Sequence, residues 1–129
     1  MQQVQQVMQQ VVPAVRITAY ARSTAFYVGG LGFHVDWEHR VEPHLPAFMQ
    51  VSRDGLTLYL TEHAGDCQVG GLVHLYVPDV DAWYAECLRT GVAVTEPPSE
   101  SLAGLRDMTV ADPDGNQLRI GTRLRAEPA

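Results

Sequence analysis

The chain has 129 residues, a length that suits one small globular domain with its own hydrophobic core. Apolar residues make up 46% of it and charged residues 19%, which is ordinary for a globular protein. The net charge of −6 argues against a nucleic-acid partner, because phosphate binding needs a clustered basic surface, whereas an acidic cavity would attract cations.

The cysteines and the apolar segments indicate a cellular location. Cys67 and Cys87 form no CxxC motif and have no histidine at the spacing of a zinc site. Two such cysteines fit a reduced, cytoplasmic protein better than a disulfide framework. No apolar run reaches membrane-spanning length, and the first residues lack the basic region and long apolar stretch of a signal peptide. We therefore expect a cytoplasmic protein with no membrane partner.

The first half of the chain begins with a predicted strand and a predicted helix. Val15 and Ile17 alternate with polar residues, as in a strand with one buried face. The segment ARSTAFYVGGLGF, residues 21–33, predicts a short helix. Ser23, or the residues just before it, would cap its start, and its glycines, the last of them Gly32, would end it.

Three further strands are expected in this half. HVDWEHRVE, residues 34–42, has the alternating polarity of a strand. PAFMQVSRDG (46–55) and LTLYLTEH (56–63) predict a hairpin with Asp54 and Gly55 at its turn. A glycine-rich linker follows near the midpoint.

The second half repeats this order. LVHLYV, residues 72–77, predicts a strand, and the segment 78–92 predicts a helix. Asp79 or Asp81 would cap this helix, and Gly91 would end it. A short strand VAV, a polar loop TEPPSESLAG and a last hairpin that turns between Asp112 and Asn116 complete the chain.

The pattern therefore predicts one domain built from a duplicated strand-helix-three-strand unit. The domain would span residues 12–123, with half-modules at about 12–64 and 71–122. Residues 1–11 would form a flexible tail, in which an amphipathic turn is the alternative because its apolar residues have helical spacing. Residues 124–129 would form a C-terminal tail.

Several stretches resemble a known family. TAFYVGGLGF (24–33) is similar to the first helix and turn of the vicinal-oxygen-chelate superfamily, the glyoxalase/bleomycin resistance protein/dioxygenase group. VDWEHRVEP (35–43), MQVSRDG (49–55), LYLTEHAGD (58–66) and RDMTVADPDGN (106–116) resemble its glyoxalase-like, bleomycin-resistance-type subfamily. The resemblance implies an α+β fold of two βαβββ modules around a concave mixed sheet. It also implies a homodimer and a cup that a ligand, a metal or a partner chain must fill.

Metal-dependent members of this superfamily hold an ion with four His or Glu side chains on the concave face. The resemblance carries these four positions onto Val12, Tyr59, Leu72 and Arg119. None offers the expected ligand, and if the alignment slips in the first strand, Ala14 and Arg16 are no better. We therefore expect no cofactor and favour a protein that is not an enzyme.

A displaced site for a divalent metal ion is the alternative. By the period of two in strands, His39, His63 and His74 could reach the cup, and histidine is the commonest metal ligand.

Trp37 is the first candidate for ligand binding. The resemblance places it where drug-binding relatives carry an aromatic residue that stacks on flat ligand rings. The alternative is that Trp37 belongs to the core or to a dimer interface. By strand alternation and charge, the other candidates to line the cup are His39, Gln50, Tyr59, His63, His74, Tyr76, Arg106, Thr109 and Arg119. Arg106 or Arg119 could hold a carboxylate or phosphate group.

The resembling motifs also contain a charged cluster, formed by Glu38, Arg40, Glu42, Glu62, Arg106 and Asp107. It could be a pocket rim, a salt-bridge network or a set of solvated strand edges. Three functions stay open on the sequence alone. The first is a small-molecule binder that sequesters an aromatic metabolite or a bleomycin-like antibiotic and so confers antibiotic resistance. The others are a metal-dependent lyase, isomerase or dioxygenase with a relocated site, and a structural or regulatory dimer module.

Overall fold

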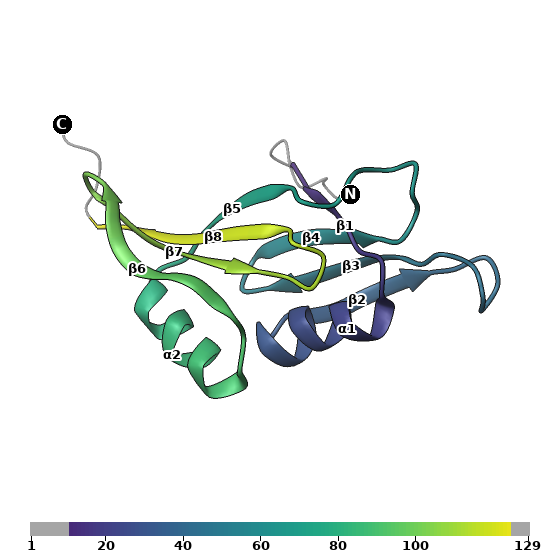
Figure 1. Ribbon diagram of the computed structural model, residues 1–129, viewed down its shortest axis with the longest axis horizontal. Helices are drawn as coiled ribbons and strands as arrows, with labels where there is room; N and C mark the ends of the chain where they lie inside the picture. The colour runs from purple at the N-terminus through teal and green to yellow at the C-terminus, as the bar shows by residue number, and fades with distance from the viewer. Residues whose placement is uncertain (1–10, 125–129) are drawn as a thin grey trace, which may run out of the picture.

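The computed structural model describes residues 11–124 and has the α+β fold of two βαβββ modules that the sequence predicts (Figure 1). Each module contributes one four-stranded mixed sheet. The amphipathic turn expected in the N-terminal tail, and the C-terminal tail after residue 124, lie outside the described residues.

Both sheets have the same internal order. Sheet A is ordered β1-β4-β3-β2 and sheet B is ordered β5-β8-β7-β6. In each, the first strand of the module pairs in parallel with the last, and the other pairs are antiparallel. The strands of sheet A are β1 (Ala14–Arg16), β2 (His34–His39), β3 (Phe48–Arg53) and β4 (Leu56–Thr61). The strands of sheet B are β5 (Leu72–Tyr76), β6 (Val94–Leu102), β7 (Leu105–Ala111) and β8 (Gln117–Arg123).

The first helix differs from the prediction at its start. It runs from α1 (Tyr20–Thr24) directly into a π-helical segment, η1 (Ala25–Gly30). Its N-cap is Ala19, which makes no side-chain cap. The prediction that Ser23 caps it is therefore wrong: Ser23 lies inside the helix and is fully buried. The expected stop at Gly32 is confirmed, because this residue adopts a φ of 79° that favours glycine.

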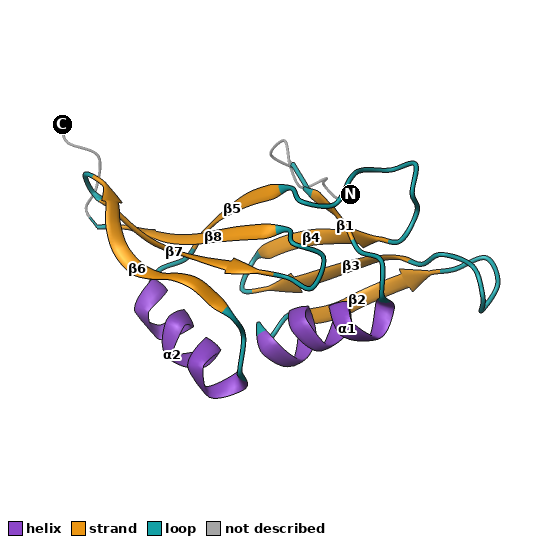
Figure 2. Cartoon of the chain, viewed as in Figure 1, coloured by secondary structure: helices purple, strands orange, loops and turns teal. Residues whose placement is uncertain are grey.

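The second helix, α2 (Val80–Thr90), begins and ends as predicted. Asp79 is the N-cap and accepts a hydrogen bond from the backbone N–H of Ala82 at 3.2 Å. Gly91 ends the helix in the left-handed conformation, and its N–H bonds to the carbonyl of Cys87. Both helices lie below the sheets in Figure 2. Within residues 11–124, no helix is long and apolar enough to cross a membrane.

Replacing Asp79 with alanine is expected to lower the free energy of unfolding by about 1 kcal/mol, because the first turn of α2 loses its side-chain acceptor. Urea denaturation followed by circular dichroism measures the change. An unchanged denaturation midpoint would show that the exposed cap contributes nothing to this helix.

Strand β6 corrects the prediction of a polar loop after residue 94. It extends over Val94–Leu102 and pairs with β7 in spite of Pro97 and Pro98. A proline has no N–H to donate, so prolines are tolerated in a strand only at the edge of a sheet or at a bulge. β6 has both properties, since it is the outer strand of sheet B and its register shifts between Glu96 and Ser99.

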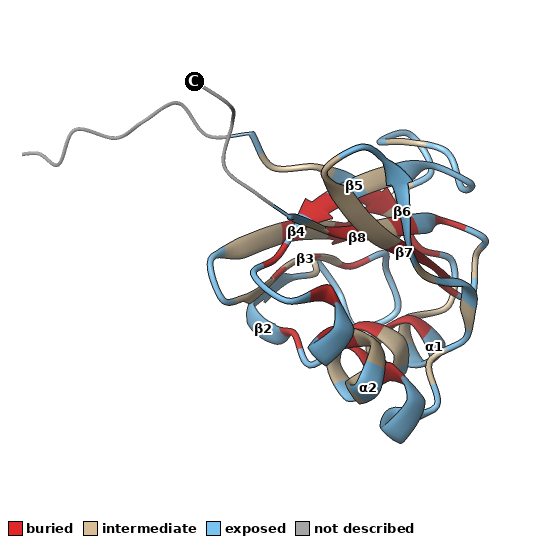
Figure 3. Cartoon of the chain, turned by 90° about the vertical axis from the view of Figure 1, so that its left-hand side faces the viewer, coloured by how far each residue is buried: buried red, intermediate tan, exposed pale blue. Residues whose placement is uncertain are grey.

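The core lies between the sheets and the helices (Figure 3). Alternate residues of the strands point into it, as the period of two requires. Tyr27 of η1 and Trp83 of α2 are buried there. Fully buried strand residues of the core are Met49, Val51, Leu58, Leu60, Met108, Val110, Leu118 and Ile120. The intervening strand residues therefore point to the opposite face of each sheet, which no helix of residues 11–124 covers.

The turn between β7 and β8 joins the two modules. The Tyr27 hydroxyl donates to Asp112 Oδ2 at 2.7 Å, and burial raises the pKa of Tyr27, which keeps this hydroxyl a donor. Asn116 Nδ2 donates to the carbonyl of Arg16 at 2.8 Å, and Thr18 bonds to Asp114. Asp112 to Asn116 is thus the predicted hairpin turn, and it also connects η1 and β1 of the first module to the second.

Arg53 makes a second junction, on the helix side. Its guanidinium lies 3.9 Å from the centre of the Trp83 ring and donates to Glu86 Oε1 at 2.8 Å and to the carbonyl of Leu31. The last residue of β3 is therefore attached to α2 of the other module.

Candidate functional site

The uncovered face of sheet A carries an aromatic cluster. Tyr59, Gln50 and Trp37 are register partners across β4, β3 and β2, so their side chains point the same way. The Trp37 ring lies 5.8 Å from that of Phe48 and 5.9 Å from that of Tyr59, within the range of aromatic pairs. Trp37 is 42% exposed, so it is not part of the core.

A bulge in β2 supplies polar groups beside this cluster. The register shifts between Val35 and Trp37, which places Asp36 on the same face as Trp37. Gln50 Nε2 and Ser52 Oγ donate to the Asp36 carboxylate at 3.0 and 2.9 Å. These hydrogen bonds lower the pKa of Asp36, and the one from Gln50 has the larger effect. The carboxylate is therefore charged at neutral pH and orients the Gln50 amide.

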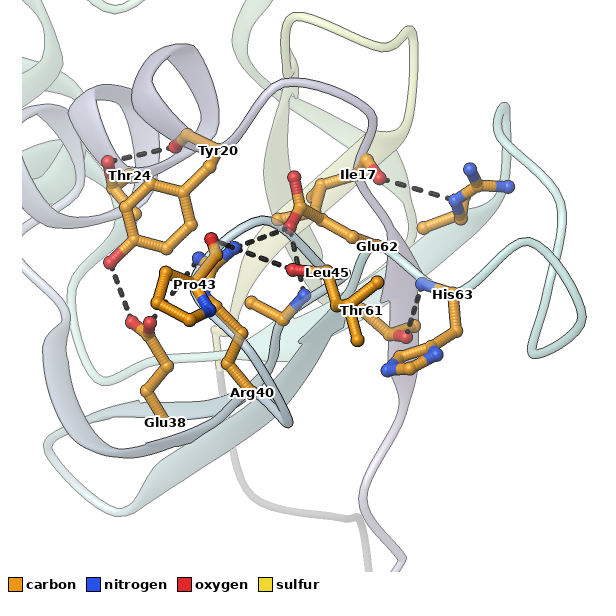
Figure 4. Close-up of polar contacts among 12 residues, drawn as sticks. Ile17, Tyr20, Thr24, Glu38, Arg40, Pro43, Leu45, Thr61, Glu62 and His63 are labelled. Carbon is orange, nitrogen blue, oxygen red and sulfur yellow. Dashed lines mark hydrogen bonds and ion pairs between the residues drawn. The ribbon is translucent and has the colours of Figure 1, made fainter.

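At the end of β2 the aromatic cluster borders an open hollow of about 530 Å³. Its lining residues are Trp37, His39, Phe48, His63 and Asp66. The buried Thr61 orients two of them. Its hydroxyl donates to Asp66 at 2.6 Å. The same hydroxyl accepts from the backbone N–H of His63 at 3.1 Å (Figure 4). The hollow thus combines an apolar ring surface with imidazole and carboxylate groups.

The uncovered face of sheet B has a different chemistry. His74, Arg119, Thr109 and Glu96 form one row across β5, β8, β7 and β6. Thr109 is nearly buried, and its hydroxyl lies 3.3 Å from Glu96 Oε1. Arg119 makes no ion pair within residues 11–124.

Tyr76, on the same face as His74 by strand alternation, is 45% exposed. The guanidinium of Arg123 lies over its ring, 4.4 Å from the ring centre. Sheet B therefore presents charged and polar groups where sheet A presents aromatic rings.

Arg106 does not lie in the cup. It is two residues before the buried Met108 in β7, so it points to the helix side of the sheet. There it makes two hydrogen bonds to Asp81 of α2, at 2.9 and 2.8 Å, and these lower the pKa of Asp81. Its donors are thus directed at a carboxylate of its own chain, and the prediction that it anchors an anionic ligand in the cup is not supported by its position.

The charged cluster predicted from the motifs is divided. Glu38, Arg40 and Glu62 form one network of ion pairs at the β2–β3 loop, whereas Arg106 pairs elsewhere. Among residues 11–124, Glu42 and Asp107 take part in no ion pair. Three of the six residues therefore form one salt-bridge network, and a fourth, Arg106, makes a separate ion pair.

Sequence reasoning missed Phe48, Asp66 and Asp36 as members of this surface. The period of two could have found Phe48, because it is two residues before Gln50. The positions of Asp66 and Asp36 depend on a turn and on a bulge that the pattern does not reveal.

A match over nearly the whole sequence then decides the family. The family described as "Glyoxalase superfamily protein" matches residues 2–127. The chain belongs to the glyoxalase superfamily. No curated protein matches this glyoxalase-superfamily chain at a significant level.

Solved structures of the superfamily resemble this chain over most of its length. TnmS3, an antibiotic binding protein from Streptomyces sp. CB03234, is 26% identical, with a TM-score of 0.74 over 92% of this chain and 99% of that chain. The bleomycin-binding protein from bleomycin-producing Streptomyces verticillus, solved with copper(II)-bleomycin, is 26% identical, with a TM-score of 0.67 over 90% and 97%. A glyoxalase/bleomycin resistance protein from Streptomyces sp. CB03234 is 27% identical, with a TM-score of 0.69 over 84% and 96%.

The residues present do not fit the metal site that the superfamily implies. The register places Ala14 opposite Tyr59 and His74 opposite Arg119, two residues beyond the Val12 and Leu72 that the resemblance suggested. Of these four partners only His74 is a common metal ligand.

The displaced histidine site does not form either. His39 and His63 line the hollow of sheet A, but His74 belongs to sheet B. In the described part of the chain, no three His, Cys, Asp or Glu side chains lie close enough together to hold an ion.

Proposed function

We propose that this glyoxalase-superfamily protein is a non-catalytic binder of flat, partly aromatic small molecules. The observation that carries the proposal is the exposed Trp37 ring, which lies in a cluster with Phe48 and Tyr59 on a face that neither helix of the described chain covers. A cluster of large rings on a surface costs free energy in water unless something covers it, so such patches indicate interaction sites. Rings of a ligand would stack on Trp37 in offset or edge-to-face geometry.

The hollow beside Trp37 supports the same proposal. About 530 Å³ is within the usual range for a small-molecule site, and apolar walls with a few polar groups are the usual composition. His39, His63 and Asp66 would orient the ligand through hydrogen bonds, while the Gln50 amide would do so at the other end of the cluster.

The similar structures favour a ligand class. Those from Streptomyces include an antibiotic binding protein and a protein that binds copper(II)-bleomycin. A bleomycin-like antibiotic is therefore the first ligand to test on this chain. Sequestration of such a drug in the cytoplasm would confer resistance without any covalent change to the drug. The proposal includes a homodimer, in which a second copy would cover part of the open faces.

Replacing Trp37 with alanine is expected to weaken the binding of bleomycin at least about tenfold, because a central aromatic anchor is lost. Isothermal titration calorimetry of both proteins measures the affinity. The melting temperature should stay within about 2 °C, since an exposed surface residue contributes little to stability.

Leu88→Ala is the matched control, since Leu88 is an exposed apolar residue on α2, and its affinity for bleomycin should equal that of the wild type. Unfolding of Trp37→Ala would place the ring in the core and contradict the proposal. So would equal affinities of Trp37→Ala and the wild type.

A further inference from the structure

The β2–β3 loop, residues 40–47, joins two residues that line the hollow. His39 is the last residue of β2, Phe48 is the first of β3, and they are register partners. A shift in the path of the loop would therefore move two walls of the hollow relative to each other. A loop of this length keeps one path only if its contacts compensate for the conformational entropy that it loses.

Arg40 supplies these contacts. Its Nη1 donates to the carbonyl of Leu45 at 2.8 Å and to that of Pro43 at 3.4 Å (Figure 4). Its guanidinium also pairs with Glu38 at 3.4 Å and with Glu62 at 3.7 Å. One planar side chain thus holds the middle of the loop to two carboxylates, that of Glu38 in β2 and that of Glu62 directly after β4.

Both carboxylates are fixed in turn. Tyr20 of α1 donates its hydroxyl to Glu38 at 2.6 Å, and the guanidinium of Arg40 lies 5.0 Å from the centre of the Tyr20 ring. Glu62 accepts the backbone N–H of Ala47 at 2.9 Å, at the end of the loop. The network therefore connects the first helix to both halves of the loop.

This network lies on the other side of the sheet from the hollow. Glu38 is the register partner of the buried Met49, so Glu38 points to the helix side, whereas its neighbour His39 points to the hollow. Arg40 itself does not line the hollow. It affects the hollow indirectly, through the loop that it holds.

We propose that Arg40 is a positioning residue, which fixes the β2–β3 loop and thereby sets the spacing of His39 and Phe48 across the hollow. What the hollow binds rests on the function proposed above. The effect of Arg40 on the loop, and on the ring of Trp37 next to Phe48, is independent of that proposed function.

The test uses Arg40→Ala in a Trp83→Phe background, in which Trp37 is the only tryptophan. Hydrogen exchange of residues 40–48 is expected to rise at least about tenfold, with no change in β7 and β8, because a local opening does not require global unfolding. The emission maximum of Trp37 should shift, because the Phe48 ring 5.8 Å away changes position. For Arg40→Lys, the exchange rate and the emission maximum should lie between those of Arg40→Ala and those of the protein with Arg40 intact. The ammonium group of lysine keeps the charge but lacks the planar guanidinium.

The matched control is Arg22→Ala, which removes an exposed arginine of α1. It should change neither the hydrogen exchange of residues 40–48 nor the emission maximum of Trp37. If Arg40→Ala does not fold, Tyr20→Phe takes its place, because it removes the hydroxyl that holds Glu38 and keeps the ring. Unchanged exchange in the loop, or unchanged emission of Trp37, would overturn the proposal.

Bleomycin titration separates this proposal from the function. If the wild type binds bleomycin, Arg40→Ala should bind it about tenfold more weakly, and a released loop with unchanged affinity would refute the positioning role. If the wild type does not bind bleomycin, the drug assignment fails. The hydrogen exchange of the loop and the emission of Trp37 then test the role of Arg40 without reference to a ligand.

Discussion

Asp112→Ala is expected to lower the free energy of unfolding by about 3 kcal/mol, as for the loss of a buried, multiply bonded carboxylate. Asp112 is 5% exposed and accepts four hydrogen bonds, from the Tyr27 hydroxyl, the Asn116 side chain and the backbone N–H groups of Asp114 and Asn116. Alanine would leave these donors without acceptors in a region that excludes water. Thermal and urea denaturation measure the loss.

Asp114→Ala is the control for this prediction. Asp114 belongs to the same turn and also bonds across the junction, to Thr18, but its contact is exposed to solvent. Its replacement should cost less than about 1 kcal/mol, as most surface changes do. Equal losses in the two variants would contradict the importance of the buried carboxylate. Tyr27→Phe removes one of the four donors and should give an intermediate loss.

Arg53→Ala should destabilise the protein by about 2 kcal/mol, because it removes a cation–π contact and two charge-assisted hydrogen bonds together. The side chain is only 18% exposed, and its contacts with Trp83 and Glu86 join β3 of the first module to α2 of the second. Denaturation monitored by tryptophan fluorescence is the suitable measurement, since the buried Trp83 reports directly on this junction.

Two variants make the test of Arg53 specific. Arg53→Lys keeps the charge but loses the flat group that stacks on Trp83, so at least half of the loss should remain. Arg89→Ala removes an arginine that also pairs with Glu86 but is 68% exposed, and its effect should be close to zero. A lysine variant as stable as the wild type would refute a role for stacking.

The sequence pattern predicts the fold well where local physics decides it. Asp79 and Gly91 bound α2 as expected, and the Asp54-Gly55 turn is present with both residues at positive φ. The pattern fails for β6, because Pro97 and Pro98 argue against a strand unless its place at the edge of a sheet is known. It also fails at Ser23, whose burial inside the first helix depends on tertiary packing.

The candidate site is only partly predictable from the sequence. Trp37 follows from the family resemblance, whereas Gln50 and Tyr59 follow from strand alternation, and the three lie together on one face. Arg106 shows the limit of this reasoning, because alternation places a residue on a face only when the register and the covering helix are known. Asp66 lines the hollow because it accepts a hydrogen bond from Thr61 within a turn. The periodicity of the sequence does not encode this contact.

The prolines of β6 have a consequence for crowded solutions. An outer strand normally offers a row of free donors and acceptors to which a foreign strand can add, and such addition is a route to fibrils. In β6, Pro97 and Pro98 lack the donor, and Glu96 and Glu100 repel another acidic chain of the same kind. This border of sheet B is therefore a poor template for growth, which helps a protein with exposed aromatic rings to remain dispersed.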